Sequence, residues 1–476
     1  MTIAVNENNT IKTVERNDAG IKTAIDILKQ QFGDNLQTSK SLREQHAHTT
    51  TYITPQLPDA VVFVTSTQEV QDIVKVCAEY KVPIIPFGTG TSLEGGVNAP
   101  LGGVSVDLSR MKEILAVNAE DLDVHVQAGV TRSELNSYLR DTGLFFPIDP
   151  GADASLGGMA ATRASGTNAV RYGTMRENVI NVTVVMADGD IVKTAHRAKK
   201  TSAGYDLTRL MVGSEGTLGI ITELTLKLHG QPEAVIAAVC SFPTIEAACE
   251  ATIMATQCAI PMARIELVDE ENIKAINIYS KLNYPETPLL MLEFHGSESG
   301  VAEQVEMFKD IAMECGGQDF NAVSSLEDRN KLWQARHDSY WAMRSYTAGK
   351  DALTTDVCVP ISRLAECVVE TQKDISDNGL YGPIIGHVGD GNFHTLICFD
   401  GKNPEEFKKM EEVVDRMAKR ALAMDGTCTG EHGIGQGKRK FMLAEHGTGV
   451  KVMSAIKLAL DPDNIMNPGK VIDFSV

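Results

Sequence analysis

The chain has 476 residues, which is too long for one ordinary domain and enough for two or three domains with their own cores. Hydrophobic residues make up 43% of the sequence and charged residues 22%, as is typical of soluble globular proteins. The formal net charge of −19 argues against a nucleic-acid-binding or anionic-membrane surface, because both need concentrated Lys and Arg. The same charge is compatible with the docking of a basic protein partner.

Targeting signals and cysteine usage both favour the cell interior. The sequence has no stretch of about 20 apolar residues that could span a bilayer, and its N-terminus lacks the apolar core of a secretory signal. We therefore expect a cytoplasmic protein, either free or peripheral to the membrane. The nine cysteines never form a C-x-x-C pair. This predicts reduced, mostly buried thiols rather than disulfides, an Fe–S cluster or a zinc ribbon.

Taken in chain order, residues 1–54 carry helical periodicity and predict an N-terminal helical lead-in. Residues 55–230 then alternate strand and helix patterns. AVVFVTS predicts a strand, and TQEVQDIVKVCAEYKV predicts an amphipathic helix with Thr67 as its N-cap. SELNSYLRDTG predicts a helix that ends at Gly143, and the Asp188-Gly189 pair predicts a hairpin turn.

Residues 231–420 mix strands such as PLLMLEFHG with helices such as GVAEQVEMFKDIAMECGG. This composition predicts an α+β cap layered on the first domain. Within it, KLWQARHDSYWAMR is expected to form one amphipathic helix that carries Arg336. Residues 421–476 contain a Gly-rich loop and are expected to return to the first domain and complete the site.

Three glycine-rich segments stand out, the first being PFGTGTSLEGG (86–96) directly after a strand. Glycine lets backbone N–H groups approach an anion closely, so this loop could cradle a pyrophosphate. Its spacing matches neither the G-x-G-x-x-G pattern nor the G-x-x-x-x-G-K-[ST] pattern of nucleotide-binding loops. Taken alone, the segment is explained equally well by a tight turn between strands. Residues 150–177 and 213–223 have the same character. Three such loops in one domain favour an extended ligand such as FAD over a small metabolite. An NAD enzyme is disfavoured because no G-x-G-x-x-G follows a strand with an acidic residue ~20 positions on.

A histidine pair provides the strongest chemical signal, in IIGHVGDGNFHTLICF (384–399). If Asp390 and Gly391 form a two-residue turn, His387 lies directly opposite His394 with their Cβ atoms ~4.5–5.5 Å apart. That separation suits two imidazoles that converge on one metal ion. The alternative is a cross-strand histidine pair on a solvated sheet.

A third ligand could come from TGEHGIGQGK (429–438), which contains Glu431 and His432. Adjacent residues of an extended segment point to opposite sides, so one could face the metal and the other the substrate. A His₂Glu set with open positions suits Zn²⁺ or Mn²⁺ acting as a Lewis acid. Two alternatives remain at this point: the segment is an ordinary glycine-rich loop, or the protein is a flavin-free zinc hydrolase. Arg336 is a natural partner for a substrate carboxylate, although an arginine taken alone is more commonly a surface residue.

The three glycine-rich segments resemble the FAD-binding domain of the vanillyl-alcohol oxidase / p-cresol methylhydroxylase superfamily, and the resemblance covers nearly the whole chain. It implies an α+β fold, with a two-subdomain FAD-binding domain of the p-cresol methylhydroxylase type and a substrate cap made of an antiparallel sheet plus helices. The first loop holds no histidine for a covalent link, which implies non-covalent FAD. The positions that match the family's FAD-binding pattern are Pro86, Gly88, Thr89, Gly90, Thr91, Ser92, Pro150, Gly151, Ser155, Gly158, Ser165, Gly166, Gly173, Glu215, Gly219 and Ile220.

The segments GHVGDGNFH, TGEHGIGQGKR and MNPGKV resemble the D-2-hydroxyacid dehydrogenase branch, which uses FAD and a divalent metal. Carried over by position, the resemblance implies a set of metal ligands, a catalytic base, an arginine for the substrate carboxylate and an asparagine that closes over the flavin. The implied metal ligands are His387, His394 and Glu431, and the implied base is His432. Arg336 is the implied arginine, and Asn467 is the implied asparagine.

TTDVCVPISRL (354–364) is similar to the equivalent stretch of the cytochrome-type D-lactate dehydrogenases. The D-2-hydroxyglutarate enzymes carry a lysine aligned with Thr354 and an asparagine near Leu396, and the absence of both here favours a short substrate such as D-lactate. The implied reaction is oxidation to the 2-keto acid, with hydride transfer to flavin N5. A glycolate oxidase flavin subunit and a D-2-hydroxyglutarate dehydrogenase are the related alternatives. The implied electron acceptor is cytochrome c, a quinone or electron-transfer flavoprotein, and a homodimer is compatible with the sequence.

Overall fold

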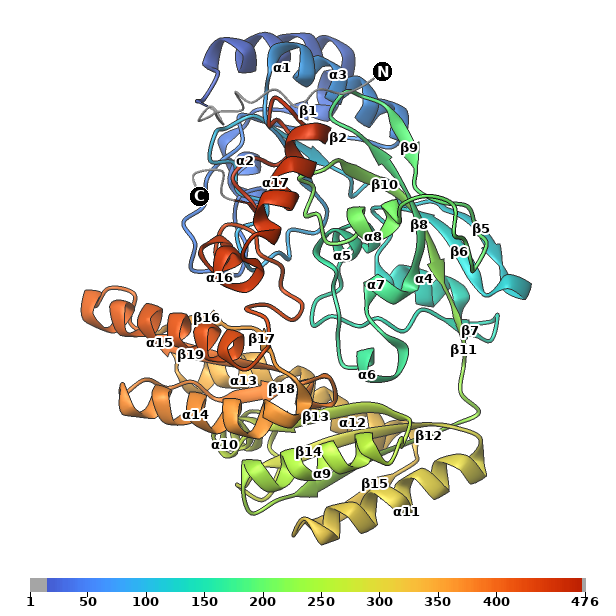
Figure 1. Ribbon diagram of the computed structural model, residues 1–476, viewed down its shortest axis with the longest axis vertical. Coiled ribbons are helices and arrows are strands. Elements are labelled where there is room, and N and C mark those ends of the chain that lie inside the picture. The colour runs from blue at the N-terminus through green and yellow to red at the C-terminus, as the bar shows by residue number, and fades with distance from the viewer. Residues whose placement is uncertain (1–14, 473–476) are drawn as a thin grey trace.

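The computed structural model describes residues 15–472, which form four β-sheets with helices packed against them. The sheets built by residues up to 230 lie above the eight-stranded sheet in Figure 1. Most strand pairs are antiparallel, and the helices are interspersed among the strands. This arrangement confirms the predicted α+β class.

The first sheet has four strands in the order β1-β2-β4-β3, and β2 and β3 both run parallel to β4. The loop that begins at Gly88 leaves the carboxyl end of β3, where open α/β sheets bind ligands. Ser66, not Thr67, caps α3, because Ser66 is extended and its side chain accepts the N–H of Glu69. The elements of this part are β1 (Leu36–Gln37), β2 (Ala60–Phe63), β3 (Ile84–Phe87), β4 (Val104–Asp107), α1 (Asp18–Phe32), η1 (Gly33–Asn35), α2 (Lys40–Gln45) and α3 (Thr67–Tyr80).

The second sheet is antiparallel and has the order β5-β6-β10-β8-β9. Asp188 and Gly189 lie in the turn of the β8–β9 hairpin, as predicted. Helix α4 ends at Leu139 rather than at Gly143, which lies in the following turn with a φ of 72°. The elements are β5 (Ile114–Asn118), η2 (Ala119–Asp121), β6 (Asp123–Gln127), α4 (Arg132–Leu139), α5 (Leu156–Thr162), α6 (Ala169–Tyr172), α7 (Met175–Asn178), β8 (Val179–Val185), β9 (Ile191–Lys193), α8 (Leu207–Met211) and β10 (Ile220–Lys227), with β7 (Leu144–Phe145) and β11 (His229–Gly230) as a separate pair.

The large sheet is antiparallel, with the order β15-β12-β14-β13-β18-β19-β16 and with β17 paired to β19. Alternation along β14 sends Leu290 and Leu292 into the core beneath α9, α11, α14 and α15, while Leu289 and Met291 face α10, α12 and α13. The elements are β12 (Ala234–Ser241), α9 (Ile245–Gln257), β13 (Met262–Val268), α10 (Glu270–Ser280), β14 (Leu289–Gly296), α11 (Glu298–Glu314), β15 (Gln318–Val323), α12 (Leu326–His337), α13 (Ser339–Tyr346), β16 (Asp351–Thr354), β17 (Val357–Cys358), η3 (Ile361–Arg363), α14 (Leu364–Asp377), β18 (Ile384–Gly386), η4 (Val388–Asp390), β19 (Asn392–Phe399) and α15 (Pro404–Ala423).

The segment expected to form one helix around Arg336 is two helices, α12 and α13, which meet at Asp338. Asp338 has a ψ of −9° where a continuing helix needs about −42°, so the helix axis turns there. The prediction of a single helix was therefore wrong. The break places Arg336 in the last turn of α12.

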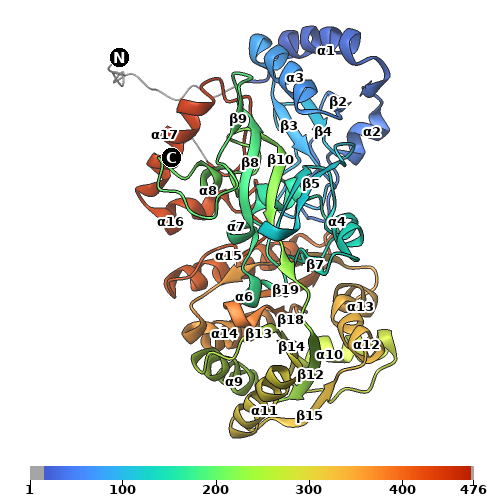
Figure 2. The same ribbon diagram turned by 90° about the vertical axis from the view of Figure 1, so that its right-hand side faces the viewer.

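After α15 the chain forms η5 (Arg439–Phe441) and returns to the first two sheets, where α16 (Met442–His446) and α17 (Gly449–Leu460) lie in both views (Figures 1 and 2). The ammonium of Lys457 donates to the carbonyls of Thr217 (2.7 Å) and Met466 (2.8 Å), which fixes α17 there. The four domain ranges, 1–54, 55–230, 231–420 and 421–476, stay predictions. Residues 1–14 of the first range and 473–476 of the last range lie outside the described part of the chain.

The nine cysteines are free thiols and six of them are buried, as predicted. Among the helices of residues 15–472, none combines the length and the hydrophobicity that crossing a bilayer requires.

Candidate functional site

A cavity of about 560 Å³ is lined by loops of the first two sheets, by α12 and α13, by β18 and β19, and by the C-terminal segment. All but two of the residues predicted from the sequence line this one cavity. They are Pro86, Gly88, Thr89, Gly90, Thr91, Ser92, Pro150, Gly151, Ser155, Gly158, Ser165, Glu215, Gly219, Ile220, Arg336, His387, His394, Glu431, His432 and Asn467.

The two predicted residues outside the lining are Gly166 and Gly173, and the backbone explains both. Gly166 has a φ of 148°, and a Cβ there would lie 2.4 Å from the carbonyl oxygen of Asp149. Gly173 ends α6 with a φ of 77°. Both positions favour glycine for local conformation, and their role in FAD binding stays a prediction.

The loops that line one end of the cavity are held together by side chains. A Cβ at Gly88 would lie 2.3 Å from Ser155 Oγ, so the first two loops touch. Asn467 Nδ2 donates to the carbonyls of Glu215 (2.7 Å) and Gly96 (3.1 Å). The Glu215 carboxylate in turn accepts two backbone N–H groups of the C-terminal loop, at 2.7 and 2.9 Å. The result is a cradle of small residues, which lets the backbone approach an elongated ligand such as FAD.

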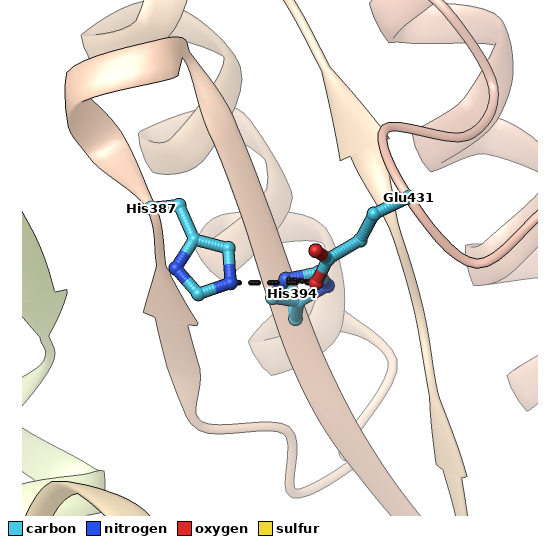
Figure 3. A group of neighbouring side chains, drawn as sticks. All are labelled: His387, His394 and Glu431. Carbon is cyan, nitrogen blue, oxygen red and sulfur yellow. Dashed lines mark ion pairs between the residues drawn. The ribbon is translucent and has the colours of Figure 1, made fainter. Parts of the chain in front are cut away.

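At the other end, His387, His394 and Glu431 converge (Figure 3), with one ligand atom of each within 4.8 Å of the others. Nε2 of each imidazole lies 3.3 Å from Glu431 Oε1. The Nδ1 atoms are already engaged, with Glu266 Oε1 (2.7 Å) for His387 and the Thr355 carbonyl (3.0 Å) for His394. Glu431 Oε2 is buried and has no hydrogen-bond partner. Two directed Nε2 atoms and a carboxylate fit a divalent cation with open positions.

The predicted register of this hairpin was wrong. Ile385, not His387, pairs with His394, because Val388–Asp390 form a 3-10 turn and Gly391 follows with a φ of 77°. The turn is therefore longer than two residues. A two-residue shift in an antiparallel pair keeps both imidazoles on one face of the sheet, and their centroids lie 5.3 Å apart.

The charges of the cluster favour an ionised carboxylate. Burial alone would raise the pKa of Glu431, but His387 and His394 lower it below its usual value. Burial would likewise lower the pKa of His387, whereas Glu266 and Glu431 raise it well above the ordinary value. In both cases the neighbouring opposite charge outweighs desolvation.

His432 is stacked on His394 with a centroid separation of 5.0 Å and an interplanar angle of 13°. Burial lowers the pKa of His432 to about 4, so its imidazole is neutral at pH 7. Its Nδ1 atom is buried without a hydrogen-bond partner. A neutral imidazole with a free nitrogen beside the cavity can accept a proton.

Arg336 also lines the cavity, but part of its guanidinium is engaged. Nε (3.0 Å) and Nη2 (2.7 Å) both donate to Glu266 Oε2. Glu266 was not identified from the sequence. A charged residue within the largely apolar strand β13 could have indicated it, because a buried charge needs partners.

A second missed residue is Asp356, whose carboxylate accepts the backbone N–H groups of Glu431 (2.9 Å) and His432 (3.0 Å). Lys438 donates to the Asp356 carbonyl at 2.9 Å and lies 3.4 Å from Glu94 in the first glycine-rich loop. Burial would raise the pKa of Asp356, but Lys438 and the nearby imidazoles lower it well below its usual value. No local pattern marked these residues, because their partners lie far away in the sequence.

Two family models match the chain: the FAD binding domain over residues 58–195 and the C-terminal domain of FAD linked oxidases over residues 231–471. The chain is 52% identical to a probable mitochondrial D-lactate dehydrogenase of Danio rerio, over 96% of this chain and 93% of that protein. It is 48% identical to the mitochondrial D-lactate dehydrogenase [cytochrome] of Arabidopsis thaliana, over 95% and 80%.

Among solved structures, p-cresol methylhydroxylase superposes with a TM-score of 0.81 at 18% identity, over 96% of this chain and 98% of that one. This likeness confirms the predicted p-cresol methylhydroxylase type of fold. With two family models on consecutive parts of the sequence and relatives aligned over nearly its whole length, the chain belongs to the FAD-linked oxidases and binds FAD.

Proposed function

We propose that the protein oxidises D-lactate, or a similarly short D-2-hydroxy acid, to the 2-keto acid with FAD and a divalent cation. The observation that carries this proposal is that the glycine-rich cradle and the His₂Glu cluster line the same cavity. Relatives with 52% and 48% identity that are named D-lactate dehydrogenases support the substrate. Membership of the FAD-linked oxidases argues against the flavin-free zinc hydrolase.

Arg336 provides the charge that holds the substrate carboxylate, because a guanidinium has five N–H donors and Glu266 occupies only some of them. A divalent cation held by His387, His394 and Glu431, either Zn²⁺ or Mn²⁺, would supply Lewis-acid polarisation of the substrate hydroxyl. FAD, when bound, supplies the acceptor for the two electrons and the proton that leave C2 together as hydride.

His432 completes the reaction by accepting the hydroxyl proton at its unpartnered Nδ1 atom. The substrate thus loses one hydride and one proton and becomes the 2-keto acid. The Asp356 carboxylate holds the backbone of His432 in place during this transfer.

The cavity wall favours a short substrate. Thr354 and Leu396 are directly opposed across β16 and β19, and both line the cavity. These are the positions where the D-2-hydroxyglutarate enzymes are expected to carry a lysine and an asparagine. A threonine and a leucine there offer no charge to a second carboxylate.

The finer features belong to the same proposal. FAD is bound without a covalent link, since the loop that starts at Gly88 contains no histidine. The acceptor is a cytochrome, in line with the name of the Arabidopsis relative. Two other acceptors, a quinone and electron-transfer flavoprotein, stay predictions, as does a homodimer. A cytoplasmic location also stays a prediction, whereas both relatives are named as mitochondrial.

The experiment is anaerobic reduction of the purified protein, followed by loss of the flavin absorbance. D-lactate should bleach the flavin faster than glycolate, L-lactate or D-2-hydroxyglutarate. A chelator should slow the bleaching by D-lactate, and added Zn²⁺ or Mn²⁺ should restore it. Rapid bleaching by glycolate or D-2-hydroxyglutarate and not by D-lactate would replace the proposal with one of the two related activities.

A further inference from the structure

Glu266 is fully buried in the middle of the large sheet, on β13 between β14 and β18. An ionised carboxylate in such a place is costly unless charged or hydrogen-bonding partners compensate it. Both of its oxygens have such partners. Oε1 lies 2.7 Å from His387 Nδ1, and Oε2 accepts from Arg336 Nε (3.0 Å) and Nη2 (2.7 Å).

The two partners come from different elements, and both line the cavity. His387 follows β18, and Arg336 lies in the last turn of α12. Engaging Nδ1 of His387 leaves Nε2 directed at Glu431. Engaging Nε and Nη2 of Arg336 leaves the Nη1 amino group and one Nη2 N–H for a ligand in the cavity.

We propose that Glu266 is the positioning residue that sets His387 for the metal and Arg336 for the substrate carboxylate at the same time. This inference rests on the proposed function, since it assigns the two partners their roles in 2-hydroxy acid oxidation. One carboxylate then fixes the distance between the cation and the carboxylate-binding guanidinium. A change at Glu266 must disturb both, whereas a change at either partner disturbs one of the two directly.

The neighbouring strand offers a matched control. Glu293 on β14 is also buried, at 5% exposure, and its Oε1 lies 2.7 Å from His295 Nε2 and 3.6 Å from Arg264 Nε. It therefore has the same kinds of partners in the same sheet. None of its partners belongs to the metal cluster or to the predicted substrate-binding residues.

The test compares Glu266→Gln with Glu293→Gln in the FAD-loaded enzyme. Glutamine keeps the shape of glutamate but removes the charge and replaces one acceptor oxygen with a donor. Zn²⁺ affinity is measured by competition with a chromophoric chelator, and kcat and KM are measured with D-lactate. In Glu266→Gln we expect Zn²⁺ affinity to fall about 10- to 100-fold and KM to rise about tenfold or more. Glu293→Gln should change neither quantity by more than about twofold.

The inference is overturned if Glu266→Gln alters only one of the two quantities or neither, or if Glu293→Gln alters both equally. Should Glu266→Gln fail to fold, Glu266→Asp keeps the charge, withdraws the carboxylate by one methylene and is read in the same way. If D-lactate does not reduce the wild-type flavin, the proposed function fails separately. In that case the positioning role of Glu266 is tested by Zn²⁺ affinity and by the binding of oxalate, which is monitored through the flavin spectrum.

Discussion

The carboxylate of Asp356 accepts the backbone N–H of His432 at 3.0 Å. The same oxygen accepts the N–H of Glu431 at 2.9 Å and the hydroxyl of Thr429 at 2.7 Å. One buried acceptor therefore fixes the loop that carries both a predicted metal ligand and the predicted base. Asp356 lies between β16 and β17, so this contact joins the large sheet to the C-terminal segment.

Asp356→Asn should loosen that loop without emptying the flavin site. The amide oxygen can still accept the bonds from Thr429, Glu431 and His432, but the NH₂ group then faces the Asn392 amide, which donates to the other carboxylate oxygen in the wild type. Leaving a buried donor unpaired costs roughly 1–3 kcal/mol. We expect Zn²⁺ affinity and kcat with D-lactate both to fall by about tenfold or more. FAD content, measured from the flavin absorbance, should stay near that of the wild type.

The control for this variant is Asp123→Asn, which removes a buried carboxylate that pairs with Arg197 on the five-stranded sheet. It should reduce thermal stability and leave Zn²⁺ affinity unchanged. Equal losses of Zn²⁺ affinity in both variants would show that Asp356 acts through general stability and not through the loop.

Thr354→Lys should shift the substrate preference toward a dicarboxylate. The new ammonium would lie opposite Leu396 at the cavity wall, where it could pair with the distal carboxylate of D-2-hydroxyglutarate. We expect the ratio of kcat/KM for D-2-hydroxyglutarate over D-lactate to rise by about tenfold, which corresponds to about 1.4 kcal/mol. Thr354→Met adds similar length without charge, and an equal shift in that variant would contradict the electrostatic explanation.

Asn467→Ala should weaken FAD binding. Its amide donates to the carbonyls of Gly96 and Glu215 and so holds the C-terminal segment against two of the glycine-rich loops. Loss of two such bonds, each worth about 0.5–1.5 kcal/mol, should raise the Kd for FAD by about tenfold. The measurement is recovery of flavin fluorescence on dilution.

Asn378→Ala provides the comparison for that variant, because it removes a side-chain amide bonded to Asp374 at the end of α14, outside the lining of the cavity. Its Kd for FAD should equal that of the wild type. A weakened Kd in Asn378→Ala, or an unchanged one in Asn467→Ala, would argue against the clamp.

His229 should make folding stability depend on pH. Burial, helped by Lys227 and Arg171, lowers the pKa of His229 to about 4 from an ordinary value near 6.5. Between these values the unfolded chain binds the proton and the folded chain does not, so stability falls as the pH drops from 6.5 to 4. Because the ring is not fully buried, we expect a loss on the order of 1 kcal/mol.

Chemical denaturation of the wild type and of His229→Gln across this pH range isolates the effect, since glutamine keeps a hydrogen bond to Asn178 within reach. The wild type should lose more stability than the variant as the pH falls. Parallel curves for the two proteins would show that His229 titrates normally in the fold.

Several features could be predicted from the sequence because their signals are local. Apolar runs marked strands such as β2 and β14, and the glycine-rich segments marked the loops that line the cavity. The histidine pair was found although its register was wrong, because a two-residue shift keeps both side chains on one face. Asp390-Gly391 suggested a two-residue turn, and the 3-10 turn before Gly391 has no comparably strong local signature.

What could not be predicted depends on partners distant in the sequence. Glu266 meets Arg336 and His387 across 70 and 121 positions, and Asp356 meets His432 across 76. These pairings exist only once β13, β18 and the C-terminal segment are brought together. The break at Asp338 was missed for a related reason, since helical periodicity continues through it and only tertiary packing decides where the helix axis turns.

The central claim is that a cation and a flavin share one cavity, and anomalous diffraction from crystals of the FAD-loaded protein tests it most directly. Data collected on both sides of the zinc or manganese absorption edge should show one peak among His387 Nε2, His394 Nε2 and the Glu431 carboxylate, with the isoalloxazine ring in the same cavity. An ordered flavin with no anomalous peak at these three side chains, in crystals grown with the metal, would contradict the claim.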